Sequence, residues 1–399
     1  MRVLVTASAH FTITRDGALW TPTASLDYVF WTRYLEVFDE VCLLVRAHPQ
    51  PAPPEGWKRV TGQRIKAVPL PDSVGPWEFV TDFARITRTI RAALADAEAV
   101  QLRIPCHIGF EVWRHLPKNR PYGVEVVADP YDMFAPGSVR HPLRPLFRWW
   151  FPRRLRKQCA RACAAAYVTE HALQRRYKPA PRAFSTYFSS VDLPESAFIS
   201  GPRRPSVHAS RATLIFVGTL AQLYKAPDVV LEAMAAGVSQ GLDLGLTVIG
   251  DGPYRPELET RARTLGLADR VCFRGQVTAG DTVRKQLDQA DVFVLPSRQE
   301  GLPRAMLEAM ARALPCIGST VGGIPELLLP EDMVLPGNVN ALARKIREVV
   351  TDPERMARMS ARNLAKAGEY SDKALGPRRT SFYQHLRVET TRWLQARGG

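Results

Sequence analysis

The stretch DVFVLPSRQEGLPRAMLEAMARALPCIGSTVGGIPELL, residues 291–328, says more about this chain than any other part of the sequence. It begins with an apolar, β-branched run typical of a buried strand, and a Ser-Arg-Gln-Glu-Gly loop follows. A helix is predicted to start near Pro303, because proline suits the first turn of a helix. The free N–H groups and the dipole at such a helix start favour a bound anion, for example a diphosphate.

Two carboxylates in this stretch point to a ligand rich in hydroxyl groups. Glu300 lies in the loop, and Glu308 lies within the helix among Ala, Met and Leu. A carboxylate on an apolar helix face costs free energy unless it is hydrogen-bonded, and the hydroxyls of a sugar and a ribose would serve. Taken singly, Glu308 is an ordinary half-exposed helix carboxylate and Lys225 an ordinary solvated lysine. The hypothesis of a site rests on their joint placement.

Short β-branched runs alternate with amphipathic segments along most of the chain, which predicts parallel sheets covered by helices. The strands predicted in the first half are 2–8, 41–46, 65–70, 99–104, 124–129 and 166–170. Those predicted in the second half are 214–218, 246–250, 271–275, 291–297 and 315–320. Four of these last five end in, or just before, Gly or Ser, and the carboxyl ends of strands are where open α/β sheets bind ligands.

Two domains are expected, because 399 residues exceed the size at which a single core stops growing. The segment SGPRRPSVHASR, residues 200–211, has no apolar periodicity and is predicted to be an exposed linker. We therefore predict an N-terminal domain over 1–205 and a C-terminal domain over 206–374. The remaining segment, about 375–399, is predicted to be a helix that crosses back to the first domain.

Five segments of the second half resemble, in order and spacing, motifs of the retaining GT-B glycosyltransferases of family 4, also called glycosyl transferases group 1. EGLPRAMLE is similar to the Glu-x7-Glu motif of that family. The segments are 216–233, 249–259, 271–277, 300–308 and 321–328. They cover nearly all of residues 212–330, whereas the first domain resembles the family only loosely. The resemblance implies an α/β GT-B fold, in which two Rossmann-like domains face a central cleft.

The resemblance also implies roles on the donor side. Glu300 would hold hydroxyls of the donor sugar, Glu308 the nucleotide ribose, and Lys225 the diphosphate oxygens. Backbone atoms near the phosphates and side chains that frame the base complete the candidate set. Its other members are Gly218, Thr219, Arg274, Val277, Gly301, Leu302 and Pro303.

The chain departs from the family pattern at several positions. Thr219 stands where relatives often have an arginine, and Arg298 or Arg304 is the candidate replacement. Asp129 stands where many relatives have a histidine, and it is either a group that stabilises positive charge or orients the acceptor, or a turn residue before Pro130. The loop HFTITRDGALW, residues 10–20, has a single glycine, Gly17, where relatives often have a pair. Weaker acceptor-side candidates are Gly17, Arg103 and His107.

The formal net charge of +15 favours an acidic partner, and many of the basic residues lie in one stretch. No acidic residue lies between Met133 and Thr169, whereas basic and aromatic residues alternate through 140–161. This composition fits docking at an anionic membrane surface, and it fits equally a packed helix with a basic solvated face. The basic members are Arg140, Arg144, Arg148, Arg153, Arg154, Arg156, Lys157 and Arg161. We find no pattern of a nucleic-acid-binding motif.

The six cysteines are scattered and predicted to be reduced core thiols, with no metal-ligand spacing around Cys159 and Cys163. The N-terminus lacks the apolar core of a signal peptide, so the expected location is the cytoplasm, at the inner face of the membrane if the basic stretch docks there.

The prediction for function is transfer of a sugar from a UDP- or GDP-sugar to a hydroxyl of a glycan or lipid-linked acceptor, without metal or other cofactor. Two alternatives stay open at this point. One is a nucleotide-sugar-binding partner protein that has lost turnover, and the other is a nucleotide-sugar epimerase of similar fold.

Overall fold

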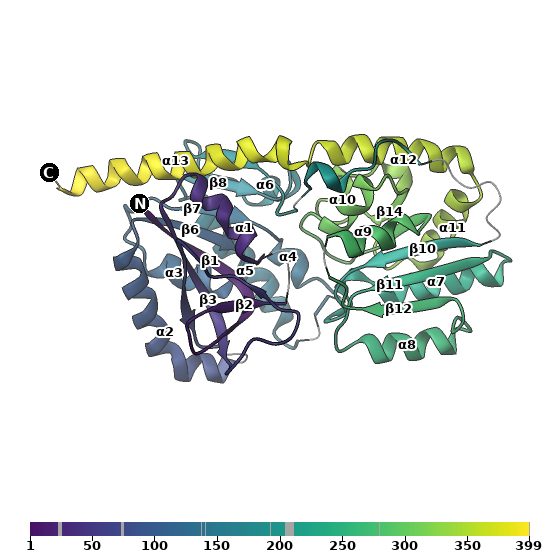
Figure 1. Ribbon diagram of the computed structural model, residues 1–399, viewed down its shortest axis with the longest axis horizontal. Coiled ribbons are helices and arrows are strands. Elements are labelled where there is room, and N and C mark those ends of the chain that lie inside the picture. Colours follow the sequence, from purple (N-terminus) through teal and green to yellow (C-terminus); the bar gives the residue numbers. More distant parts are fainter. Residues whose placement is uncertain are drawn as a thin grey trace. The chain divides into compact units, whose positions relative to one another are not determined.

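The computed structural model describes residues 1–22, 26–72, 76–136, 138–139, 141–191, 193–203, 211–278 and 280–398. Its internal contacts divide the chain into two units (Figure 1). Unit 1 comprises Met1–Ala128, Trp150–Phe188 and Gly376–Gly399, and unit 2 comprises Asp129–Trp149 and Ser189–Leu375. The predicted boundary between residues 205 and 206 and most of the predicted linker lie outside the described residues.

Unit 1 is built on one sheet with the strand order β4-β2-β1-β6-β7-β8-β9, to which β3 and β5 are added beside β1. All its neighbouring strands run parallel except β2 and β4. The strands are β1 (Arg2–Ile13), β2 (Leu19–Thr21), β3 (Glu40–Pro49), β4 (Lys58–Arg59), β5 (Ile65–Leu70), β6 (Ala99–Ile104), β7 (Gly123–Val126), β8 (Ala164–Tyr167) and β9 (Phe184–Tyr187). Strands β6, β7 and β8 are buried along their whole length, as expected for parallel strands covered on both faces.

The helices of unit 1 lie between and over these strands (Figure 1). They are α1 (Tyr28–Thr32), the 3-10 turn η2 (Arg33–Glu36), α2 (Pro76–Asp96), α3 (His107–His115) and α6 (Ala172–Arg176), with the last part of α13 (Asp372–Gly398). Helix α13 packs on β7 closely enough that a Cβ added at Gly123 would lie 3.1 Å from Phe382 and 3.2 Å from Leu386. Tyr34 of η2 stacks on Tyr383 of α13 with ring centroids 4.6 Å apart.

The segment predicted as a loop over residues 10–20 is a β-hairpin, which corrects that prediction. Strand β1 continues to Ile13 and pairs antiparallel with β2, with Thr12 opposite Trp20. The turn between the strands contains Asp16 and Gly17, and Gly17 adopts a φ of 79°, which glycine reaches without strain. β-branched and aromatic residues flank this Asp-Gly pair, the combination that favours a hairpin.

Unit 2 is a second, wholly parallel sheet with the order β12-β11-β10-β13-β14-β15. Its strands are β10 (Ala212–Val217), β11 (Leu244–Ile249), β12 (Val271–Gly275), β13 (Val292–Leu295), β14 (Cys316–Ser319) and β15 (Met333–Val334). Its helices are α7 (Pro227–Ser239), α8 (Arg255–Thr264), α9 (Asp281–Asp288), α10 (Arg304–Ala311), α11 (Val339–Val350) and α12 (Pro353–Gly368). Two parallel sheets with covering helices confirm the predicted GT-B type of fold, while β15 was not predicted.

The chain of unit 2 changes direction across its sheet between β10 and β13. From β10 the strands β11 and β12 follow on one side, and β13, β14 and β15 follow on the other. In open α/β sheets, ligands bind outside the carboxyl ends of the two strands at such a switch point. The loops after β10 and β13 are therefore the first place to look for a ligand site.

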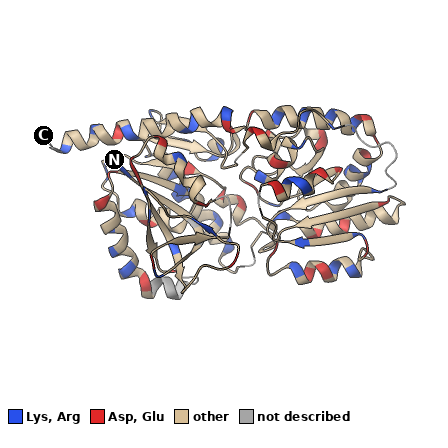
Figure 2. Ribbon diagram, viewed as in Figure 1, with Lys and Arg blue, Asp and Glu red and all other residues tan. Residues whose placement is uncertain are grey.

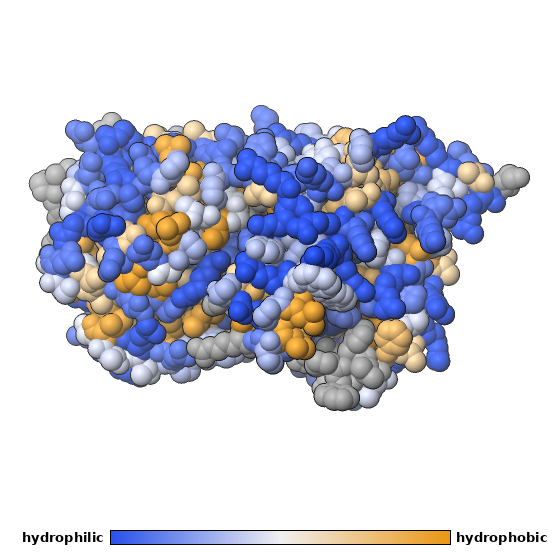
Figure 3. Space-filling view, turned by 180° about the vertical axis from the view of Figure 1, so that it is seen from behind, coloured by the Kyte–Doolittle hydropathy of each residue, from blue (hydrophilic) through white to orange (hydrophobic). Residues whose placement is uncertain are grey.

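Two further helices are α4 (Pro130–Met133) and α5 (Arg144–Cys159), and α5 contributes residues to both units. The face of the molecule drawn in Figure 3 is mainly hydrophilic, with hydrophobic side chains in separate small groups. In the part of the chain that the structure describes, no helix has both the length and the hydropathy needed to cross a bilayer.

Candidate active site

Lys225 and Glu300 meet at the switch point of the second sheet. Lys225 Nζ donates a hydrogen bond of 2.6 Å to Glu300 Oε1, and Ser297 Oγ donates one of 2.7 Å to the same oxygen. Glu300 is only 7% exposed, and the Lys225 side chain is 16% exposed. A carboxylate this buried is stable because both donors satisfy one of its oxygens.

Local backbone geometry places the lysine. The chain leaves β10 through a loop that ends in the 3-10 turn η4 (Leu223–Lys225), and α7 begins at Pro227. Ala226, between them, has a φ of 58°, in the left-handed region that is unusual for alanine. This residue reverses the chain and leaves Lys225 at the carboxyl edge of the sheet. Glu300 arrives at the same edge from the loop after β13.

Arg298 ties these two loops together. Its guanidinium donates two hydrogen bonds to the Asp228 carboxylate, at 2.9 and 2.6 Å, and one of 2.6 Å to the carbonyl of Leu223. Its backbone N–H also donates to the carbonyl of Tyr224 at 2.7 Å. The bond to Asp228 raises the pKa of Arg298 further, so the side chain stays charged. Arg298 was one of two candidates to replace a phosphate-binding arginine, but its donors are used to hold the Lys225 loop.

The turn over residues 321–323 packs against the Glu300 loop and is hydrogen-bonded to it. The N–H of Gly323 donates to the carbonyl of Gly301 at 2.6 Å. Gly322 has a φ of 55°, and a Cβ added there would lie 2.2 Å from the carbonyl oxygen of Glu300. Only glycine fits at this position, because a side chain would be strained and would also collide with the loop that carries the acid. The glycines of the motif 321–328 therefore hold the loop that carries Glu300.

A chain of glycines joins the ends of the first three strands of this sheet. Gly218 N–H donates to the carbonyl of Ile249 at 2.9 Å, and Gly250 N–H donates to the carbonyl of Gly275 at the same distance. A Cβ added at Gly250 would lie 1.9 Å from the carbonyl oxygen of Gly218. Thr219, directly after Gly218, accepts a bond of 3.1 Å from the N–H of Ala221 on its hydroxyl.

The start of α10 lies within a few residues of Glu300. Pro303 is the N-cap with an extended backbone rather than the first helical residue, and Leu302 before it is buried. Arg304, the first residue of the helix, is exposed, and Glu308 lies one turn further along and is half-buried. The assignment of Glu308 to a ribose stays a prediction.

Arg274 and Val277 lie at the edge strand β12 and just beyond it. Arg274 is exposed and Val277 is half-buried. Gly275 lies between them with a φ of 69°, where a Cβ would come within 2.8 Å of the Arg255 guanidinium. This position next to Gly250 is consistent with the predicted contact of Arg274 and Val277 with the nucleotide base. That contact stays a prediction.

The candidates outside the second sheet fall in different surroundings. Asp129 is buried and caps α4, where its Oδ1 accepts from the N–H of Tyr131 at 2.8 Å, as the turn interpretation expects. Arg103 is 8% exposed and lies 3.2 Å from Glu125 in the core of unit 1. His107 is exposed at the first position of α3. The acceptor-side roles of these residues remain predictions, and the Arg103 guanidinium is already paired with Glu125.

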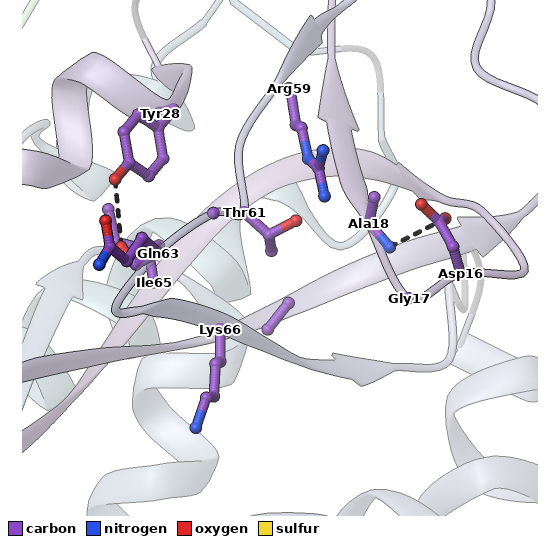
Figure 4. A pocket seen from close by; sticks show the side chains of 11 residues that line it. Asp16, Gly17, Ala18, Tyr28, Arg59, Thr61, Gln63, Ile65 and Lys66 are labelled. Carbon is purple, nitrogen blue, oxygen red and sulfur yellow. Dashed lines mark hydrogen bonds between the residues drawn. The ribbon is translucent and has the colours of Figure 1, made fainter.

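Gly17 lines an open cavity of about 780 Å³ in unit 1 (Figure 4). One wall is the hairpin turn, where Asp16 accepts a bond of 3.2 Å from the N–H of Ala18. Tyr28 forms the opposite wall and donates from its hydroxyl to the carbonyl of Gln63 at 3.1 Å. Arg59 and Lys66 are also part of the lining.

Two residues of the site, Asp228 and Ser297, were not predicted. Asp228 follows Pro227 and looks like a helix-start carboxylate, and Ser297 looks like the end of a strand. Their roles depend on contacts with residues of the other loop, which no local pattern reveals. Among the described residues, no group of three or more His, Cys, Asp or Glu side chains is arranged to hold a metal ion.

A double-mutant cycle on Arg298 and Asp228 checks the positioning role. We expect Arg298→Lys to lower kcat/KM about tenfold, because lysine cannot make the two parallel bonds of a guanidinium. Asp228→Asn should give a similar loss, and the double variant little more than either, with a coupling free energy of about 1–3 kcal/mol. If the losses of kcat/KM in the two single variants add up in the double variant, Arg298 and Asp228 do not act as a pair. Arg263→Lys, on the exposed face of α8, is the matched control.

Comparison with known proteins fits this geometry. Residues 211–352 match the profile of the family described as glycosyl transferases group 1. Over these residues, in the second half, the chain is similar to the group 1 glycosyltransferases. Protein CapJ of Staphylococcus aureus is 23% identical over 322 residues, which is 80% of this chain and 80% of CapJ.

Solved structures show the same fold for the whole chain. A sucrose-phosphate synthase from Thermosynechococcus elongatus superimposes with a TM-score of 0.72 at 16% identity, covering 97% of this chain and 99% of the other. HepE from Anabaena, solved in complex with UDP-glucose, superimposes with a TM-score of 0.65 at 14% identity, covering 98% and 99%. At these identities the likeness concerns the fold.

Proposed function

We propose that this protein is a group 1 glycosyltransferase that moves a sugar, with retention of configuration, from a UDP- or GDP-sugar to a hydroxyl of a glycan or lipid-linked acceptor. The contact between Lys225 and Glu300 carries the proposal. A cation suited to phosphate and an acid suited to sugar hydroxyls meet within one hydrogen bond at a switch point, the usual ligand position of such sheets. HepE, of the same fold, was solved with UDP-glucose, which supports a nucleotide-sugar donor.

The proposed reaction breaks the bond between the sugar C1 and the diphosphate oxygen. The acceptor oxygen bonds to C1 on the face from which the diphosphate leaves, and the hydroxyl proton passes to a phosphate oxygen. The products are the new glycoside and a nucleoside diphosphate. Negative charge grows on the leaving oxygen, so a positive group fixed nearby lowers the barrier more than it stabilises the bound donor.

In this proposal Lys225 and the start of α10 supply that positive charge, so the transfer needs no divalent metal. One well-placed charge-stabilising group contributes about 3–4 kcal/mol in comparable sites. Glu300 would exchange one of its present bonds for sugar hydroxyls and hold C1 next to the acceptor hydroxyl, on the face that the diphosphate leaves. Asp129, His107 and the cavity beside Gly17 are the proposed acceptor-side contacts, and the site of action is the cytoplasm.

One observation favours a rival function, a nucleotide-sugar-binding protein without turnover. Thr219 stands where a second cation is common, and Arg298 is held by Asp228 instead of replacing it. An epimerase would need an acid and base pair at the sugar. Glu300 is instead held by hydrogen bonds from Lys225 and Ser297, which favours charge stabilisation over proton transfer.

The test is a turnover assay with a panel of UDP- and GDP-sugars and soluble glycan acceptors. We expect transfer with one donor and a product whose anomeric configuration, read by NMR, equals that of the donor. Excess chelator should leave the rate unchanged. An inverted product would refute retention, and a tenfold loss with chelator would refute metal independence. Donor binding without transfer to any acceptor would favour the rival function.

A further inference from the structure

Helix α5 presents an unusual stripe to solvent. Leu146, Trp149, Arg153, Arg156 and Lys157 are all exposed, and their spacing of three and four residues puts them on one face of the helix. The opposite face is buried through Pro152, Leu155, Gln158 and Cys159. We call the exposed set, together with Leu143 just before the helix, the α5 stripe.

The two halves of the α5 stripe differ in chemistry. Leu143, Leu146 and Trp149 are 50%, 52% and 53% exposed. Arg153, Arg156 and Lys157 follow on the same face. An apolar end thus passes into a cationic end along one helix. Other large exposed hydrophobic residues, such as Val29 and Leu335, are not part of such a run.

Packing holds α5 firmly enough to present this stripe. Phe151 contacts Phe110 of α3 with ring centroids 5.6 Å apart. Gln158 donates to the carbonyl of Gly109 at 3.2 Å, and its own carbonyl accepts from the Tyr122 hydroxyl at 2.8 Å. The exposed leucines and the tryptophan are therefore not a consequence of a loose helix. Burial of these three side chains against an apolar partner would be favourable.

The charge of this region differs from that of helix α8. No acidic residue lies in α5 or anywhere between Met133 and Thr169. Helix α8, in contrast, alternates acidic and basic residues (Figure 2), and Arg255 pairs with Glu259 at 2.7 Å. The basic groups of α5 thus lack acidic neighbours within their own helix, and they favour a polyanionic partner.

The apolar half beside the cationic half favours one kind of polyanionic partner over another. A nucleic acid would be bound by the cations but would gain little from two exposed leucines. An anionic bilayer accommodates both halves, since leucine and tryptophan enter the interface while arginine and lysine bind acidic headgroups. We propose that the α5 stripe docks this protein on an anionic lipid surface. This proposal rests on the proposed function in one respect: docking would bring the site to an acceptor that is linked to a membrane lipid.

Vesicle sedimentation with the full chain tests this. We expect the protein to pellet with vesicles of phosphatidylcholine and phosphatidylglycerol at low salt, and to bind pure phosphatidylcholine far more weakly. Binding should weaken at about 1 M salt, where screening shortens the range of charge interactions to about 3 Å. Arg153→Gln with Lys157→Gln should lower the partition coefficient about thirtyfold.

Two further variants separate the halves of the stripe from general effects. Leu146→Ser with Trp149→Ser should lower binding to the mixed vesicles at least tenfold, and should abolish the blue shift of tryptophan fluorescence on binding. Arg263→Gln with Arg358→Gln removes the same charge from exposed sites elsewhere and should bind as the wild type does.

Several outcomes would overturn the proposal. They are equal binding of the wild type to both kinds of vesicle, unchanged binding of both stripe variants, or an equal loss in the control. Turnover on a soluble acceptor should stay unchanged in every stripe variant. If vesicles bind as expected but no donor is turned over, the proposed function fails and the docking surface stands.

Discussion

Lys225→Ala is expected to lower kcat about a hundredfold to a thousandfold, the usual cost of removing one fixed group that stabilises charge in a transition state. The lysine donates to Glu300, and in the proposed function this is where the sugar and its diphosphate meet. KM for the donor should rise less than kcat falls, because the leaving oxygen carries more charge in the transition state than in the bound donor. Steady-state kinetics with the accepted donor measures both.

Lys345→Ala provides a control for this prediction. Lys345 also pairs with a glutamate, Glu348, at 2.7 Å, and its side chain is 17% exposed, but it lies on α11. It should keep wild-type kinetics. Thermal denaturation of both variants checks that a lost ion pair does not unfold the protein. A Lys225→Ala enzyme with kcat within threefold of the wild type would remove the lysine from the mechanism.

Glu125→Gln should cost the largest amount of stability, about 3–5 kcal/mol in the free energy of unfolding. Glu125 is 2% exposed, and its carboxylate lies 3.2 Å from Arg103. Gln101 donates to it at 3.2 Å and the Tyr34 hydroxyl at 3.4 Å. Burial disfavours the charged guanidinium, and the glutamate offsets this, so that the pKa of Arg103 stays raised. Without the carboxylate, a charge is left in the core of unit 1 with no counterion among these partners.

Urea denaturation followed by circular dichroism measures this loss. Glu354→Gln is the control, because the Glu354 side chain is 90% exposed and 3.8 Å from Arg358, where a surface pair contributes little. A change below about 1 kcal/mol in Glu125→Gln would contradict the view that the buried pair balances the core, since breaking such a pair normally costs several times as much.

Pattern alone predicted much of the fold. The strands 65–70, 99–104 and 271–275 have the predicted bounds, because each is a short apolar or β-branched run flanked by polar residues. Strands of two or three residues, such as β4 and β15, were not predicted, since their pairing partners define them. The hairpin after β1 was missed because the family resemblance suggested a loop there.

The site was predictable to the extent that its chemistry is local. The convergence of Lys225 and Glu300 followed from ordered motifs, and the structure places them in contact. The role of Arg298 did not follow, because its partner Asp228 is 70 residues away in the sequence. A side chain that bonds to a distant loop has the same local signature as one that faces a ligand.

The shortest strand of the first sheet also affects how the protein behaves in concentrated solution. Strand β4 ends the strand order of that sheet and consists only of Lys58 and Arg59, both exposed. A longer apolar strand in this place would offer its unpaired backbone groups to a neighbouring molecule. Two long cationic side chains repel an identical edge, so intermolecular sheet extension, a common first step of aggregation, is blocked on this side.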